Sequence, residues 1–235
     1  MAINNRDKQS TRVLYVPVNT GGGSGGGSQA KIKVGESGIK LTNSTFTEVP
    51  QIFDFSDVTD MTYMFDKCES LTTISEMNTA NVTDMRAMFN GCNSLTTIPK
   101  MDTSKVTSMS YMFGSCYLLT TIPEMDTSQV TNMGEIFYEC PSLTTIPEMD
   151  TSKVTYIGSF YGSGSLTDLG GFVGLKVNLN LSGSSKLTHD SIMNIINKAA
   201  DVTENPKTMT FGETNLAKLS DEEKGIATAK GWTLA

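Results

Sequence analysis

The chain has 235 residues and a formal net charge of −7, which allows one or two domains with a sizeable core and excludes a generally basic nucleic-acid-binding protein. The longest apolar run near the amino end is the proline-interrupted Val13–Val18, far shorter than a signal-peptide core or a membrane span. We therefore expect a soluble protein made in a cytoplasm, with no membrane insertion and no nucleic acid among its partners.

The first twenty residues are too few to fold alone and differ in charge from the rest of the chain. Arg6, Lys8 and Arg12 against Asp7 give residues 1–20 a net charge of +2, which leaves −9 for the remainder. Such asymmetry indicates that this arm and the body have different roles. Residues 21–30 follow as a linker that includes GGGSGGGS, a composition typical of flexible tethers.

Within the arm, the stretch STRVLYVPVN at residues 10–19 has the alternation of a β-strand and no domain of its own to join. We expect this strand to add to the sheet edge of a partner protein and so to anchor the chain. A disordered tail is the alternative interpretation. The residues predicted to anchor the partner are Arg12, Val13, Leu14, Tyr15 and Val16.

A repeat of 24 residues dominates the chain from about residue 41 to residue 172. Self-similarity at a fixed period of this length is typical of stacked repeat proteins. A single unit cannot bury its apolar stripe, but stacked units form a continuous core. The spacing recurs in several columns: Cys68, Cys92, Cys116 and Cys140; Phe65, Phe89, Phe113 and Phe137; Met61, Met85, Met109 and Met133; and Leu71, Leu95, Leu119 and Leu143.

Each repeat unit combines two patterns. The V-x-x-M-x-x-M-F pattern spaces apolar residues three or four apart and predicts a short helix or helical turn, which side-chain oxygens of the preceding Asp-Thr-Ser would cap. The S-L-T-T-I-P pattern predicts a short strand that ends at Pro99, Pro123 or Pro147. We therefore expect a helical side and a strand side in every coil.

The run MFNGCNSLTTIPKMDTSKVTSM, residues 88–109, resembles the BspA-like type of leucine-rich repeat, which is found in bacterial surface proteins and is also encoded by bacteriophages. The resemblance implies an α/β repeat solenoid of right-handed, leucine-rich-repeat-like coils of about 24 residues, closed by a small α/β cap at the carboxyl end. It also implies a binding or structural role with no catalytic residues. We favour a bacteriophage-encoded member of this family.

The repeat weakens at both ends, as terminal units do. Residues 46–50 keep an echo of the strand pattern, and Leu166 and Leu169 take the leucine and isoleucine places of the last unit. One further strand is indicated by alternating apolar residues at Leu175, Val177, Leu179 and Leu181. We therefore assign residues 31–182 to the solenoid.

The remaining residues, 183–235, predict a small α/β cap on the final coil. Thr188 or Asp190 would cap a helix whose apolar face is Ile192, Met193, Ile195 and Ile196. The stretch KTMTFG predicts a strand, and SDEEKGIATAKG predicts a helix that begins at Ser220. WTLA predicts a terminal strand whose Trp232 would fill the interior of the cap.

The cysteines and the acidic residues of the repeat invite a disulfide or metal interpretation. The four cysteines hold one place in the unit and lack the close pairs of a zinc site, which predicts a column of inward free thiols; disulfides between neighbouring coils are the alternative. A second column of the repeat consists of Asn78, Asp102, Asp126 and Asp150. We expect these side chains to cap turns or helices, and a ladder of calcium sites is the alternative.

Catalytic patterns are weak throughout the sequence. His189 is the only histidine, and it is expected on the surface or at a helix start, whereas a nucleophilic mechanism needs a nucleophile and an orienting acid beside the ring. GGGSGGGS lacks the lysine and the following helix of a phosphate-binding loop. We therefore expect no enzyme, no cofactor and no bound metal.

Binding residues are expected where the repeats differ from one another. The recurrent Thr-Thr pairs are interpreted as exterior strand residues, and a regular ligand on a threonine array is the alternative. Two columns vary, with Tyr63, Ala87, Tyr111 and Glu135 in one, and Lys67, Gly91, Ser115 and Glu139 in the other. Variable polar positions of a solenoid face solvent, where a partner would be recognised. The candidate recognition residues are Tyr63, Lys67, Arg86, Tyr111, Glu135 and Glu139.

Three functions are compatible with this organisation. Each of them is also compatible with assembly of the chain into a homo-oligomer. We favour a bacteriophage virion component, such as a capsid-attached head fibre or decoration protein, which is made in the host cytoplasm without a signal peptide. Its arm would dock on a capsid or other virion protein, and its solenoid would meet a host cell-surface protein or glycan. The alternatives are a BspA-like bacterial cell-surface adhesin, which would require a secretion signal, and an engineered fusion that carries a GGGS linker.

Overall fold

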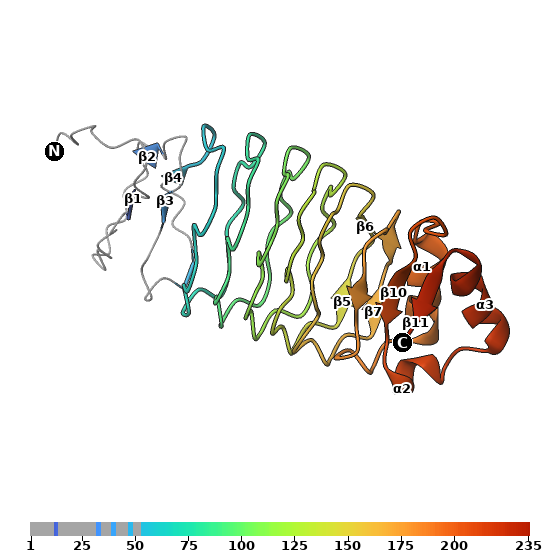
Figure 1. Ribbon diagram of the computed structural model, residues 1–235. Helices are drawn as coiled ribbons and strands as arrows, with labels where there is room; N and C mark the ends of the chain where they lie inside the picture. Colours follow the sequence, from blue (N-terminus) through green and yellow to red (C-terminus); the bar gives the residue numbers. More distant parts are fainter. Residues whose placement is uncertain (1–11, 14–31, 34–38, 41–46, 49–52) are drawn as a thin grey trace.

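The computed structural model describes residues 12–13, 32–33, 39–40, 47–48 and 53–235. Repeat coils stack side by side along the molecule, and the helices of the described residues lie at the carboxyl end (Figure 1). The elements in chain order are β1 (Arg12–Val13), β2 (Ile32–Lys33), β3 (Ile39–Lys40), β4 (Phe53–Asp54), β5 (Thr145–Ile146), β6 (Met149–Asp150), β7 (Asp168–Leu169), β8 (Phe172–Val173), β9 (Leu179–Asn180), α1 (His189–Lys198), β10 (Lys207–Thr210), α2 (Glu213–Leu216), α3 (Asp221–Ala229) and β11 (Trp232–Leu234).

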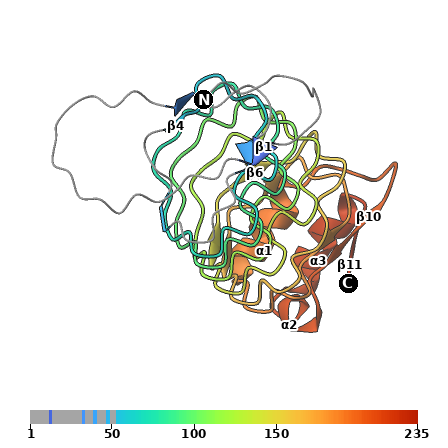
Figure 2. The same cartoon turned by 90° about the vertical axis from the view of Figure 1, so that its left-hand side faces the viewer.

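The stacking register confirms the 24-residue period. Parallel bridges join equivalent residues of successive coils, in the order Asp60, Asp84, Ser108, Asn132 and Tyr156. Seen from the amino end, the coils enclose one common interior (Figure 2). The chain therefore forms the stacked repeat array that the sequence predicts.

The interior is filled by columns of identical side chains. Phe65, Phe89, Phe113 and Phe137 stack ring on ring, with centroids 5.5, 5.9 and 5.8 Å apart and nearly parallel planes. Phe160 and Phe172 extend the column into the last coils at 5.9 Å per step. Columns of valine, methionine, leucine and cysteine surround the rings and are also buried. Because each apolar stripe is covered by the coils beside it, burial depends on stacking.

Of the short helix or helical turn that the spacing predicts in each repeat, the helix is wrong, because the V-x-x-M-x-x-M-F segment forms successive turns. Two residues per coil have positive φ, between +49° and +79°: Tyr63, Ala87, Tyr111, Glu135 and Gly158 in one column, and Lys67, Gly91, Ser115, Glu139 and Gly162 in the other. Alternate backbone N–H groups then point to carbonyls of the next coil, and not to carbonyls four residues earlier as in a helix. In the first such coil, the N–H groups of Met61, Tyr63, Phe65 and Lys67 donate at 2.7 to 2.9 Å to the carbonyls of Asp84, Arg86, Met88 and Asn90.

On the strand side of each coil, the paired segments are only one or two residues long. β5 pairs in parallel with β7, and β6 with β8, whereas earlier described coils are joined by single bridges such as Glu48–Thr73 and Thr121–Thr145. β5 ends directly before Pro147, as the sequence predicts. In three of the four Thr-Thr pairs, the hydroxyl of the first threonine donates to a carbonyl of the preceding coil, as Thr96 Oγ1 does to the Thr72 carbonyl at 3.2 Å.

The cap continues the parallel ladder of the solenoid. Ser159 of the last coil bridges Asn180 of β9, and β9, β10 and β11 form a parallel sheet in that order. α1 packs against β7 and β8, and α3 packs against β11 and α1. Trp232 is buried, and its indole Nε1 donates to the Ala200 carbonyl at 2.9 Å. The predicted cap elements are thereby confirmed, and α2 is an addition that the sequence did not indicate.

Both helix starts that the sequence predicts are confirmed. Thr188 is the N-cap of α1 and accepts a hydrogen bond from the Ser191 amide. Ser220 caps α3 and forms a capping box with Glu223, in which each residue bonds the backbone of the other. Within the part of the chain that the structure describes, no helix is long and apolar enough to cross a membrane.

At the amino end, two short parallel pairs precede the repeat array. β1 pairs with β3, with Arg12 opposite Ile39, and β2 pairs with β4. The expectation that the arm has no strand to join within its own chain is therefore wrong for Arg12 and Val13. The other predicted anchoring residues, Leu14, Tyr15 and Val16, and the GGGSGGGS linker lie outside the described residues.

Candidate binding surface

The turn segments of successive coils form one surface, which we call the turn face and define as the exposed and half-buried residues of 60–70, 84–94, 108–118, 132–142 and 156–165. Of the seven tyrosines of the chain, six belong to it. Five of these are between 41% and 62% exposed, namely Tyr63, Tyr111, Tyr117, Tyr156 and Tyr161. Large exposed aromatic side chains grouped on one surface are typical of binding sites.

The predicted recognition residues all lie on this face, although they differ in exposure. Tyr63, Lys67, Arg86 and Tyr111 are exposed, whereas Glu135 and Glu139 are half-buried. Ala87, from the same variable column, is buried and does not fit the expectation. Both variable columns are the positive-φ positions of the coils, so backbone conformation contributes to their varied residue types, including the glycines.

Arg86 is held by its own coil. Its Nε donates to Asp84 Oδ2 at 2.9 Å, and the same carboxylate accepts the Arg86 amide N–H through Oδ1 at 3.0 Å. The hydrogen bond and the charge of Asp84 raise the pKa of Arg86. The pair is exposed, so it contributes little to stability, but it fixes the position of the guanidinium on the surface.

The structure brings Glu135 together with Tyr156, a residue that the sequence reasoning missed. Glu135 Oε1 accepts from the Tyr156 hydroxyl at 3.3 Å, and Oε2 accepts from the Ser159 amide at 3.1 Å. Burial, followed by the charge of Glu135, raises the pKa of Tyr156. Both oxygens of the carboxylate therefore have fixed partners in the next coil.

Two glycines make room for this pair. A Cβ on Gly134 would lie 2.7 Å from the Tyr156 ring, and a Cβ on Gly158 would lie 2.8 Å from the Glu135 carboxylate. The tyrosine ring and the carboxylate therefore lie directly over backbone that has no side chain. The sequence does carry a signal, since Tyr156 interrupts a column that otherwise holds Asp60, Asp84, Ser108 and Asn132.

A second aromatic group lies one turn further along the face. The rings of Tyr138 and Tyr161 stack with centroids 5.7 Å apart. Glu139 lies beside them and accepts from Ser115 Oγ at 3.4 Å and from the Tyr117 hydroxyl at 3.5 Å. The charge of Glu139 raises the pKa of Tyr138. Tyrosine and glutamate thus alternate along the carboxyl-terminal half of the turn face.

An open groove adjoins this half of the face, where the last coils meet the cap. Its volume is about 530 Å³, within the usual range of ligand pockets of about 300–1,000 Å³. One wall carries Glu135, Tyr156 and Ser159, and the other is the outer surface of β9 and β10. The lining residues of that second wall include Asn178, Asn180, Lys207, Thr208 and Thr210.

The predicted free thiols are confirmed as an internal column. All four cysteines are buried thiols that form no disulfide, and three donate to the carbonyl of a phenylalanine in the preceding coil, as Cys116 Sγ does to Phe89 at 3.2 Å. Burial raises the pKa of Cys140 to about 12. Ser163 takes the cysteine place in the last coil, with its hydroxyl 2.9 Å from the Phe137 carbonyl. The thiols therefore pack the core.

The acidic column and the histidine also have the structural roles that the sequence favoured. Asn78, Asp102, Asp126 and Asp150 each accept the amide N–H two residues on, at 2.9 to 3.1 Å, which makes them turn-forming residues. His189 begins α1, and its Nε2 lies 2.8 Å from Glu223 Oε1. Among the described residues, no group of three or more histidine, cysteine or acidic side chains is arranged to hold a metal ion.

Comparison with known proteins supports the repeat assignment. A family model described as "Mycoplasma protein of unknown function, DUF285" matches residues 39–143 and 116–168. Among solved structures, the chain is similar to the T. pallidum leucine-rich-repeat protein TpLRR, with 20% identity and a TM-score of 0.54 over 80% of this chain and 84% of that chain. At this identity the likeness shows the fold alone. No curated protein matches the sequence. Since the family model spans more than half of the 235 residues, the chain belongs to the DUF285 family of BspA-like leucine-rich-repeat proteins.

Proposed function

We propose that this protein is a non-enzymatic binding protein that recognises a cell-surface macromolecule through its turn face. The single observation that carries the proposal is the group of exposed tyrosines on a continuous stack of coils. Tyrosine supplies a large, amphipathic contact area with little side-chain entropy to lose on binding. Membership of a BspA-like leucine-rich-repeat family, which suggests surface or binding proteins, supports the same role.

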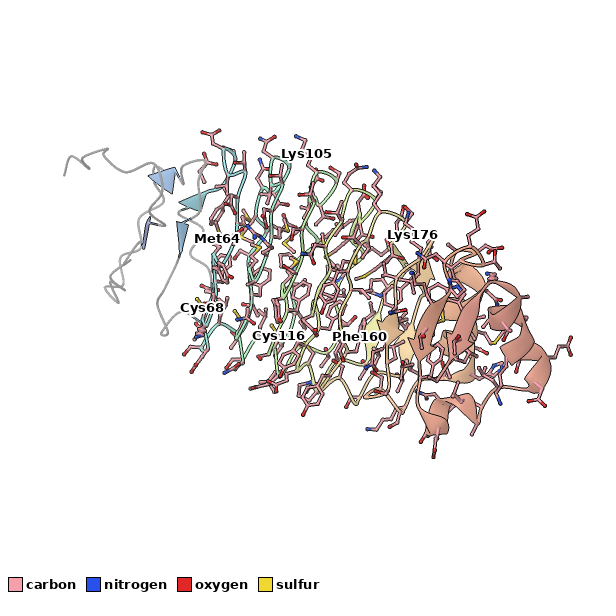
Figure 3. The ribbon with its side chains drawn as sticks, in the orientation of Figure 1. Met64, Cys68, Lys105, Cys116, Phe160 and Lys176 are labelled. Carbon is pink, nitrogen blue, oxygen red and sulfur yellow. The ribbon has the colours of Figure 1, made fainter. Side chains whose placement is uncertain are left out.

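The experiment measures binding of the labelled, full-length protein to a panel of intact bacterial and animal cells. Tyr63→Ala combined with Tyr111→Ala removes two exposed rings, and Ala87 already occupies the same column of the repeat. We expect at least a fivefold loss of cell binding. The matched control combines Lys105→Ser and Lys153→Ser. These two lysines are equivalent residues of the repeat, 48 positions apart, and belong to another exposed column. Lys105 lies on the upper edge of the molecule in Figure 3. Equal binding by the tyrosine variant and the wild type, or no binding to any cell, would rule the proposal out.

We further propose that the arm anchors the protein to a larger assembly, with a bacteriophage capsid or another virion protein as the partner. The arm differs in charge from the body and is joined to it by a Gly/Ser-rich stretch, which suits a tethered attachment. Display on a bacterial cell surface is the second candidate, and it is supported by the bacterial names of the matched family and of the similar structure.

Deletion of residues 1–20 tests the anchoring proposal. We expect the shortened chain to stay folded, because the solenoid and its cap have their own core, and to disappear from purified virions or from the cell-surface fraction of the producing cells. Which of the two fractions contains the full-length chain decides between virion and cell-surface display. Wild-type attachment of the shortened chain would show that the arm is not the anchor.

A further inference from the structure

We propose that the groove between the last coils and the cap binds a neutral saccharide, with the Tyr156 ring as its stacking platform. The inference rests on the proposed binding function and adds a ligand class and a site to it. Tyr156 is 55% exposed, and its ring lies against the backbone of Gly134, where a Cβ would approach within 2.7 Å. Its hydroxyl is fixed by Glu135 at 3.3 Å. The ring is therefore held in place on the surface before any ligand arrives, which lowers the entropy cost of binding.

The opposite wall presents a small array of amides and hydroxyls. β9 and β10 pair with Leu179 opposite Met209 and Asn180 opposite Thr210. Since Leu179 and Met209 point into the core, the alternation of strand side chains places the neighbouring residues on the outer face of the sheet. The outer residues that line the groove are Asn178, Asn180, Thr208 and Thr210.

Several polar groups of this wall are available for a ligand. The Asn178 and Asn180 side-chain oxygens accept internal hydrogen bonds, from the Thr208 amide at 2.9 Å and from the Ser182 amide at 3.0 Å. Within the described residues their amide nitrogens donate no hydrogen bond, and the Lys207 ammonium likewise has no hydrogen bond or ion pair. The groove therefore offers oriented donors on one wall, opposite a carboxylate and an aromatic ring on the other.

This combination matches the chemistry of a sugar ring. A pyranose has a flat face of C–H groups that stacks on an aromatic ring, and hydroxyls around its edge that both donate and accept hydrogen bonds. The two charges of the groove, Glu135 and Lys207, are opposite in sign, so they favour a neutral ligand. A phosphorylated or strongly acidic ligand would need several cations, as anion sites usually have.

A peptide strand is a poorer occupant of this groove. Addition of a strand requires a sheet edge with unpaired backbone groups. β9 is covered on both sides, since Asn180 pairs with Thr210 of β10 and is bridged to Ser159 of the last coil. A ligand in the groove would therefore be bound by side chains and not by backbone groups of a sheet edge, which favours a ligand rich in hydroxyl groups.

The test is calorimetric titration of the full-length protein with a panel of neutral hexose and N-acetylhexosamine oligosaccharides, with a sialylated oligosaccharide and a short peptide for comparison. We expect at least one neutral oligosaccharide to bind with a Kd in the millimolar range or tighter. Tyr156→Ala should weaken that binding more than tenfold. Gly134→Ala should also weaken it more than tenfold, because the added methyl displaces the Tyr156 ring.

Ile226→Ala is the control, since this side chain of α3 is also exposed, at 38%, but lies outside both the groove and the turn face. It should leave saccharide affinity unchanged, and thermal melting checks that each variant is folded. The proposal fails if no neutral oligosaccharide binds, if Tyr156→Ala binds as the wild type does, or if the peptide or the acidic sugar binds more tightly. Cell binding that depends on Tyr63 and Tyr111 without saccharide binding would refute the groove and leave the proposed function standing. Saccharide binding without cell binding would support the groove site and refute the proposed function.

Discussion

At the scale of single residues, one column of the repeat shows how a local bond supports the stack. Asp60, Asp84 and Asn132 each accept the amide N–H two residues on, at 2.8, 3.0 and 2.9 Å. Ser108 holds the same place, and its side chain is one bond too short for this contact. Its Oγ is buried without a hydrogen-bond partner in the described part of the chain. A buried polar atom without a partner costs stability.

Ser108→Asn should therefore stabilise the protein. The longer amide side chain matches Asn132 in the same column and should form the missing bond to the Ser110 amide. A gain of about 0.5–1.5 kcal/mol in the free energy of unfolding is expected, the net value of one intramolecular hydrogen bond. Chemical denaturation measures it, with Ser104→Asn on a nearby exposed turn as the control. A destabilised Ser108→Asn variant would contradict this account of the column.

At the scale of elements, the turn segment differs most from the sequence prediction. Valine, methionine and phenylalanine three or four apart satisfy the spacing of a helix and also that of successive turns, because both conformations return the chain to one side every few residues. Local spacing therefore could not distinguish them. The positive-φ residues and the backbone hydrogen bonds to the next coil distinguish the turns from a helix. Those hydrogen bonds exist only when a neighbouring coil is present.

Glycine substitutions test the positive-φ account. Gly158 has a φ of +74°, and a Cβ there would lie 2.7 Å from the Glu135 amide nitrogen. Gly158→Ala should lower the free energy of unfolding by about 1–3 kcal/mol. Gly225 lies in α3 with nothing within 4 Å of an added Cβ, so Gly225→Ala should raise it by about 0.5–1 kcal/mol. Denaturant titration of both variants should give opposite signs, and equal signs would be incompatible with this explanation.

The contact between α1 and α3 predicts a pH dependence of cap stability. The hydrogen bond to Asp190, followed by the one to Glu223, raises the pKa of His189. The hydrogen bond from the Ser220 amide, followed by His189, lowers the pKa of Glu223. The histidine contribution is complete below about pH 6.5 and is lost as the pH rises through its raised pKa. The glutamate contribution is present above about pH 4.3 and is lost as the pH falls through its lowered pKa.

Together the two groups should stabilise the cap most between about pH 4.3 and pH 6.5. His189→Gln keeps a polar side chain but removes the titration, so the variant should lose less thermal stability than the wild type between pH 6 and pH 8. Melting curves at several pH values provide the measurement. Parallel pH profiles for the two proteins would mean that this contact does not couple to folding.

At the scale of the whole molecule, the coils and the cap share one core. The phenylalanine column runs from Phe65 to Phe172, and the backbone ladder passes through Ser159 and Asn180 into the sheet of the cap. Because each coil is covered only by its neighbours, opening one coil exposes the next. Burial of the thiols follows from the same arrangement, since one thiol lies inside each of four successive coils.

Thiol alkylation should report on the integrity of the stack. Burial raises the pKa of Cys92, Cys116 and Cys140, so little reactive thiolate is present near neutral pH in the folded protein. We expect no alkylation of the native chain and four modified cysteines after unfolding, counted by mass spectrometry. Cys116→Ser should remain folded, since Ser163 fills the equivalent place. Rapid modification of a native thiol would show that a coil opens independently of the stack.

The sequence by itself determined the period, the columns of the core and the elements of the cap other than α2. These features depend on residue type at a fixed spacing and on contacts between close neighbours, such as the capping box of Ser220 and Glu223. Only the tertiary structure decided that the second half of each repeat is a series of turns. It alone also joined Glu135 to Tyr156 and set both against β9 and β10, because these contacts link segments brought together by the stacking register, which no local pattern specifies.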